Sequence, residues 1–153
     1  MIPASAHMLC WETSTAASRV LVVDDNVSLL TLFAEVLSHE GYGVVAVSNG
    51  SQAELRVAAE PEFDLLITDY NMPGMNGVEL ASRLTLRQPH LPVLLISGEK
   101  LEDLPTAIVG SRGWRFLPKP FGCARLISAV HELLPTSSSR ISELQRANSP
   151  RPP

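Results

Sequence analysis

The sequence lacks any apolar stretch long enough to cross a membrane, because its longest uninterrupted apolar runs contain four to five residues. A membrane-spanning helix needs about 20 consecutive apolar residues. Residues 1–18 also lack the basic start and the apolar centre of a secretory signal peptide. We therefore expect a protein without membrane insertion that is located in the cytoplasm.

The sequence also contains few cysteines and no excess of positive charge. The two cysteines, Cys10 and Cys123, lie far apart in unlike contexts, so we expect two free thiols rather than a disulfide. The formal net charge of −4 argues against direct binding of nucleic acid, whose phosphates attract basic surfaces. The motifs G-x-x-x-x-G-K-[ST] and G-x-G-x-x-G are missing after the first apolar run, which argues against a nucleotide-binding protein.

The apolar residues that are present predict a single α/β domain. With 153 residues, of which 45% are hydrophobic, the chain can build one proper core. Helix-period stripes separate short apolar runs, for example Val27, Leu30, Ala34 and Leu37, or Ile127, Val130 and Leu134. The runs, which we interpret as strands, cover residues 20–23, 44–47, 65–67, 93–96 and 114–117.

Strand and helix therefore alternate five times, which is typical of a doubly wound α/β fold. Continuous β-branched runs further indicate strands that are buried on both faces. We predict a five-stranded parallel sheet with helices on both faces.

Composition also predicts the limits of the domain. We expect the domain over residues 19–135, a disordered leader over residues 1–18, and a disordered Ser/Pro/Arg tail over residues 136–153. Inside the domain, Pro105 falls in the first half of the fourth helical segment, where proline is tolerated only in the first turn. We expect this helix to start near Leu104 or to be irregular.

Polar residues follow four of the five predicted strands. In an open parallel sheet, the functional crevice lies beyond the carboxyl ends of the strands, so we expect these residues to converge there. They are Asp24 and Asp25 after the first strand, Asp69 after the third, Ser97 after the fourth and Lys119 after the fifth.

This set of residues suits the binding and transfer of a phosphoryl group. Two carboxylates about 4 Å apart repel each other by roughly 4 kcal/mol at an effective dielectric constant near 20. A divalent cation removes this repulsion, and oxygen ligands together with phosphate oxygens favour Mg²⁺. Lys119 adds a positive charge and Ser97 a hydroxyl, while Asp69, in the middle of the set, is the candidate nucleophile.

Four sequence blocks resemble the receiver domain of two-component response regulators. The blocks are LVVDDN, ITDYNMPGMNG, LLISG and FLPKPF. Their spacing also fits, because Asp69 follows Asp25 by 44 residues, Ser97 follows Asp69 by 28, and Lys119 follows Ser97 by 22. The resemblance covers residues 19–134 and implies a flavodoxin-like fold of the receiver type.

The resemblance implies that Asp69 accepts a phosphoryl group from a histidine kinase or a histidine phosphotransfer protein. It implies that Asp25 and Asp69 bind Mg²⁺ through their side chains, Asn71 through its backbone carbonyl, and Asp24 mainly through water. The implied protein is a phosphoacceptor that at most catalyses its own phosphorylation and dephosphorylation, and is not an enzyme in the usual sense.

The resemblance also implies a switch and a class of partners. Ser97 and Lys119 would hold the phosphoryl oxygens, and Phe116 occupies the family's aromatic switch position. The added charge of about −1.5 to −2 would alter a protein-binding face. The output protein is unknown from the sequence, and a phosphorylation-dependent dimer is one form that the output could take.

Three alternatives are open to test. An aspartate-nucleophile phosphatase of the haloacid-dehalogenase type would carry a second acid two residues after Asp69, where this sequence has Asn71. A degenerate receiver that acts as a constitutive adaptor would lack an acid or the lysine, and none is missing. His131 with Glu132 resembles the phosphoacceptor pair of sensor kinases, but no second long helix is predicted that could build the required bundle.

Overall fold

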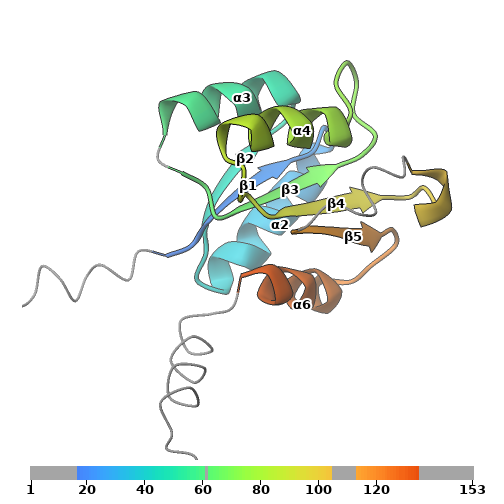
Figure 1. Ribbon diagram of the computed structural model, residues 1–153. Helices are drawn as coiled ribbons and strands as arrows, with labels where there is room; N and C mark the ends of the chain where they lie inside the picture. Colours follow the sequence, from blue (N-terminus) through green and yellow to red (C-terminus); the bar gives the residue numbers. More distant parts are fainter. Residues whose placement is uncertain (1–16, 61, 105–112, 135–153) are drawn as a thin grey trace, which may run out of the picture. The chain divides into compact units, whose positions relative to one another are not determined.

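The computed structural model describes residues 17–60, 62–104 and 113–134 (Figure 1). Residues Ser18–Leu134 form one compact unit. The predictions for residues 1–16, for the helix after Pro105 and for the tail from residue 136 lie outside the described residues.

Five parallel strands form a single sheet in the order β2-β1-β3-β4-β5. The prediction of a five-stranded parallel sheet is therefore confirmed, and each strand lies where an apolar run predicted it. The order places β1, β3 and β4 in the interior of the sheet and β2 and β5 at its edges. The strands are β1 (Arg19–Val23), β2 (Gly43–Val47), β3 (Leu65–Asp69), β4 (Val93–Ser97) and β5 (Trp114–Pro118).

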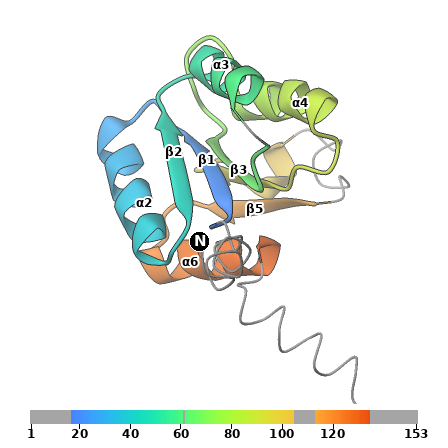
Figure 2. The ribbon, with the colours of Figure 1, turned by 90° about the vertical axis from the view of Figure 1, so that its left-hand side faces the viewer.

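Helices cover both faces of the sheet, as predicted (Figures 1 and 2). Helices α2 (Val27–His39) and α6 (Cys123–Leu133) pack on one face, where Leu37 and Val130 join Val20 and Val22 in one apolar cluster. Helices α3 (Gly50–Ala59) and α4 (Gly77–Arg87) pack on the other face over Leu21 and Val23. A single 3-10 turn, η1 (Leu101–Asp103), follows β4.

Asparagine side chains begin three of the helices. Asn26, Asn49 and Asn76 each accept hydrogen bonds from backbone N–H groups in the first turn of α2, α3 and α4. Such N-caps satisfy donors that have no partner within the helix. Because each cap follows the carboxyl end of a strand or the loop after it, the helices start close to the crevice.

Two details of the predicted burial are wrong. The edge strands β2 and β5 are only partly buried, because each pairs with a neighbour on one side alone. In α2, Val27 is 67% exposed, whereas Phe33, which does not belong to the predicted stripe, is buried with Leu30 and Leu37. Val27 opens the first turn of α2, and the apolar neighbours that bury the helix begin at Leu30.

Among the described residues, every helix is too short or too polar to cross a membrane. This agrees with the short apolar runs of the sequence.

Candidate functional site

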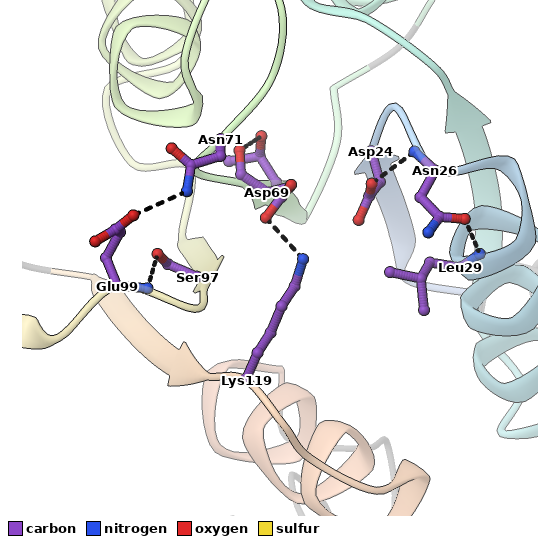
Figure 3. A network of polar contacts seen from close by, with 9 residues as sticks. Asp24, Asn26, Leu29, Asp69, Asn71, Ser97, Glu99 and Lys119 are labelled. Atoms are coloured by element: carbon purple, nitrogen blue, oxygen red, sulfur yellow. Dashed lines mark hydrogen bonds and ion pairs between the residues drawn. The ribbon is translucent and has the colours of Figure 1, made fainter.

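Three carboxylates meet at the carboxyl edge of the sheet, and Figure 3 shows Asp24 and Asp69 of this group together with Lys119. Val23 of β1 pairs with Thr68 of β3, so Asp24 and Asp69 follow at the same level on neighbouring strands. One oxygen from each of Asp24, Asp25 and Asp69 lies within 4.8 Å of the other two. Within the described ranges, no other group of three acidic, histidine or cysteine side chains is so close together.

Lys119 supplies the positive charge of the site. Its Nζ lies 3.1 Å from Oδ1 of Asp69. The backbone N–H of Lys119 donates a hydrogen bond to the carbonyl of Ser97 at 2.8 Å, and the Lys119–Pro120 peptide bond is cis. Lys119 is thus attached to the end of β4 through its backbone and reaches Asp69 through its side chain.

The carboxylates of Asp24 and Asp69 are held in an unfavourable environment. Their residues are only 2% and 6% exposed. Burial raises the pKa of Asp24, although the N–H of Asn26 acts in the opposite direction. Burial is also the largest influence on the pKa of Asp69, which is raised although the ammonium of Lys119 acts in the opposite direction.

One oxygen of the cluster lacks a hydrogen-bond partner. Oδ1 of Asp24 accepts from the N–H of Asn26 at 2.8 Å, whereas Oδ2 is buried without any donor among the described residues. A buried, unsatisfied carboxylate oxygen is costly unless a cation or a donor reaches it. The donor set, made entirely of oxygen, is the type that Mg²⁺ prefers.

Ser97 and Phe116 lie on the neighbouring strands β4 and β5. Ser97 is fully buried, and its hydroxyl oxygen accepts from the N–H of Glu99 at 2.9 Å. Phe116 pairs with Leu95 across β4 and β5 and is partly buried in a small apolar cluster around Leu95 and Leu104. Ser97 follows Leu95 by two residues in β4, so both side chains lie on the same face of the sheet.

Asn71 and Glu99 form an exposed hydrogen bond with each other next to the site. Nδ2 of Asn71 donates to Oε1 of Glu99 over 3.4 Å, so the Asn71 side chain faces Glu99 rather than Asp24 (Figure 3). Sequence reasoning did not identify Glu99. Its only sequence signal is its position two residues after Ser97, in the loop that leaves β4.

His131 lies apart from the acidic cluster, in the last turn of α6. Its Nε2 lies 3.7 Å from Oε2 of Glu40 and is buried without a hydrogen-bond partner among the described residues. A histidine phosphoacceptor needs a ring nitrogen that a donor can reach. Nε2 of His131 does not meet this condition, although the side chain as a whole is 39% exposed.

Fold and site together define a doubly wound α/β domain with an acidic crevice and one lysine at the carboxyl ends of its strands. Residues 20–131 match the family model of the response regulator receiver domain. The chain belongs to this family, whose members are phosphoacceptor signalling domains of two-component systems. The resemblance seen in the sequence is confirmed, and the match favours neither the phosphatase nor the adaptor alternative.

Individual relatives differ in how much of them this chain covers. The response regulator receiver protein CpdR of Brucella abortus is 34% identical over 116 residues, which are 76% of this chain and 96% of CpdR. The putative two-component response regulator ARR21 of Arabidopsis thaliana is 36% identical over 118 residues, or 76% of this chain. This chain spans only 19% of the length of ARR21.

A solved structure supports the same fold. The response regulator protein TrrA of Thermotoga maritima, in complex with Mg²⁺ and BeF, matches with a TM-score of 0.67 and 27% identity. The match covers 76% of this chain and 99% of TrrA.

Proposed function

We propose that Asp69 accepts a phosphoryl group from a phosphohistidine of a histidine kinase or of a histidine phosphotransfer protein. One observation carries this proposal: Asp69, at the end of β3, lies within 4.8 Å of two further carboxylates and 3.1 Å from the Lys119 ammonium. Other acidic clusters could bind a cation, but a buried carboxylate paired with a lysine can also act as a nucleophile toward phosphorus.

The transfer exchanges one bond for another. A carboxylate oxygen of Asp69 attacks phosphorus and forms an O–P bond, while the P–N bond to the donor imidazole breaks. The electron pair of that bond stays on the imidazole nitrogen, and the ring leaves neutral because its other nitrogen carries a proton. The product is an acyl phosphate on Asp69.

Mg²⁺ is the cation that we propose for the acidic cluster. The unsatisfied Oδ2 of Asp24 and the all-oxygen donor set fit a hard cation. Asp25 and Asp69 would bind it through their side chains, Asn71 through its backbone carbonyl, and Asp24 mainly through water. When bound, Mg²⁺ offsets the negative charge that the carboxylates and the incoming phosphoryl oxygens share. The complex of TrrA with Mg²⁺ and BeF supports this assignment by analogy.

Lys119 and Ser97 are proposed to hold the phosphoryl oxygens. The Lys119 Nζ already contacts Asp69, and the Ser97 hydroxyl lies on the adjacent strand end with Glu99 N–H donating to it. Its own hydrogen is then available for a phosphoryl oxygen. A shift of Ser97 toward the phosphoryl group would open space for Phe116 to turn inward and alter the face around β5.

We further propose that the unit over residues 19–135 signals through protein contacts rather than through catalysis on a substrate. The likeness to CpdR, a response regulator receiver protein of which this chain covers 96%, supports this proposal. The output protein would bind the altered face, either directly or through a phosphorylation-dependent dimer. A cytoplasmic location, where kinases of this kind present their phosphohistidine, remains part of the proposal.

Mass spectrometry tests the proposed function directly. Incubation of the full chain with phosphoramidate and Mg²⁺ should add about 80 Da, the mass of a phosphoryl group that replaces a proton. The adduct should be labile to base and to hydroxylamine, and Asp69→Asn should show no addition. An adduct that is stable to base but labile to acid would point to a histidine such as His131 and contradict the proposal.

A further inference from the structure

Thr68 is a buried polar residue that the proposed function leaves without a role. The buried polar or charged residues among the described ones are Asp24, Thr68, Asp69 and Ser97. Three of them belong to the site, and Thr68, which is fully buried, directly precedes Asp69 in β3. Valine has a similar shape and would avoid the cost of burying a hydroxyl. Packing alone therefore does not explain why a hydroxyl is buried at this position.

The Thr68 hydroxyl contacts the backbone of the phosphoacceptor itself. Its Oγ1 donates a hydrogen bond to the carbonyl oxygen of Asp69 at 3.1 Å. The N–H of the same peptide group, which belongs to Tyr70, donates to the carbonyl of Ile96 at 2.8 Å. Ile96 directly precedes Ser97 in β4. The peptide group that follows Asp69 is thus held at both ends, and one end is fixed to the strand that carries Ser97.

Gly77 confines the same carbonyl from another side. A β-carbon on Gly77 would lie 2.2 Å from the Asp69 carbonyl oxygen, and the N–H of Gly77 donates to the carbonyl of Tyr70 at 2.9 Å. The Asp69 carbonyl therefore has no free space toward α4. Because this carbonyl and the Asp69 side chain leave the same Cα, fixing one restricts the direction of the other.

We propose that Thr68 is a positioning residue for the phosphorylation of Asp69. Its hydroxyl fixes the peptide group after Asp69, so that the carboxylate meets phosphorus beside Ser97 and Lys119. Thr68 does not touch the phosphoryl group and acts only through Asp69. This inference rests on the proposed function, since it concerns the rate of that same transfer. An attacking atom that is less well placed reacts more slowly, even when every reacting group is present.

Two substitutions in the full chain separate the hydroxyl from the size of the side chain. Thr68→Val removes the hydroxyl and keeps the branched shape, whereas Thr68→Ser keeps the hydroxyl. With saturating phosphoramidate and Mg²⁺, Thr68→Val should lower the phosphorylation rate constant about two- to tenfold, as expected for one lost hydrogen bond. Thr68→Ser should stay within about twofold of the wild type, and neither change should alter the phosphoramidate concentration that gives half the maximal rate.

Two further measurements distinguish positioning from general damage to the fold. The amide hydrogen of Tyr70 should exchange faster in Thr68→Val than in the wild type or in Thr68→Ser. Mg²⁺ affinity should fall by less than the rate, because Asp24 and Asp25 are untouched and Asp69 keeps its carboxylate. If Thr68→Val does not fold, Thr68→Ala against Thr68→Ser gives the same comparison.

Three outcomes would overturn the inference. They are wild-type rates in Thr68→Val, equally slow rates in Thr68→Val and Thr68→Ser, or a loss of Mg²⁺ binding in Thr68→Val that matches the loss of rate. A wild-type chain that gains no phosphoryl group would instead refute the proposed function. In that case, unchanged Tyr70 exchange in Thr68→Val would still refute the role of the hydroxyl.

Discussion

Asp24 and Asn26 join the acidic cluster to the start of helix α2. Oδ1 of Asp24 accepts from the N–H of Asn26 at 2.8 Å, and the Asn26 side chain in turn accepts from the N–H groups of Ser28 and Leu29. A residue of the cluster therefore also orders the N-cap of a helix. The buried charge of Asp24 destabilises the fold, whereas its hydrogen bond to Asn26 stabilises the fold. A substitution can therefore remove the charge and keep the hydrogen bond.

Asp24→Asn should therefore stabilise the protein at neutral pH in the absence of divalent cations. The substitution keeps an oxygen for the Asn26 N–H and removes a buried negative charge. Because burial raises the pKa of Asp24 in the folded state, Asp24 contributes most to stability below its unfolded pKa of about 3.9, and this contribution is lost as the pH rises through the folded pKa. The advantage of the variant should thus grow with pH, in thermal unfolding between pH 4 and 7.5.

Mg²⁺ supplies a control for this prediction. Binding of Mg²⁺ to the wild type should offset the same charge and reduce the advantage of Asp24→Asn at pH 7.5. A variant that is less stable than the wild type at neutral pH without Mg²⁺ would show that the Asp24 charge is not the destabilising feature.

Asp25→Asn should abolish the response to Mg²⁺. Asp25 is the exposed member of the cluster, so its loss removes a proposed ligand with little effect on the core. Titration of the wild type with Mg²⁺ should shift NMR signals around Asp25 and Asn71 or change Trp fluorescence. An unchanged titration in Asp25→Asn would contradict the proposed metal site, and Glu102→Gln, an exposed acid outside the cluster, serves as the matched control.

Gly77→Ala should destabilise the fold and disturb the site at once. A β-carbon would lie 2.2 Å from the Asp69 carbonyl oxygen and 3.0 Å from Cδ1 of Leu95, so the start of α4 must move away from β3. Such overpacking costs about 1–3 kcal/mol, which urea denaturation can measure. Gly98→Ala is the control, because its β-carbon would meet nothing within 4 Å, and its effect should stay within about 0.5 kcal/mol.

Lys119→Ala should separate phosphorylation from the response to it. The variant keeps the proposed nucleophile Asp69 and the carboxylates, so it should still accept a phosphoryl group, although more slowly. A phosphoryl group shifts a two-state equilibrium only through contacts that differ between the states, and we expect the Lys119 ammonium, now 3.1 Å from Asp69, to form one such contact. NMR shifts around Phe116 upon phosphorylation should therefore be much smaller than in the wild type. A full wild-type change in phosphorylated Lys119→Ala would refute a role of Lys119 in the switch.

Sequence reasoning predicted the gathering of Asp24, Asp25, Asp69 and Lys119 because it follows from a single rule. Parallel strands end at the same edge of a sheet, so the residues after each apolar run meet whatever the order of the strands. The chemistry of the side chains then limits what the cluster can bind. No knowledge of packing was needed for these steps.

Other features depend on packing and could not be predicted from the sequence. The partial exposure of β2 and β5 follows from the strand order, which crossover connections set and apolar runs do not reveal. Phe33 lies inward and Val27 outward because of the way α2 packs on the sheet, which buries Leu30, Phe33 and Leu37. The contacts of Thr68 and Glu99 depend on the direction of one side chain in a folded loop or strand, for which a single sequence carries no signal.

The parallel sheet also determines where the chain can change length. Every residue assigned to the site, including Thr68, lies in the last two residues of a strand or in the loop that follows one, apart from Phe116 within β5. Among the described residues, the turns that lead into the strands, such as residues 88–92 before β4, contribute none of them. An insertion of a few residues in such a turn lengthens the chain without shifting the strand pairing at the opposite edge. The entering turns are thus the natural places to introduce a tag or a reporter while the crevice stays intact.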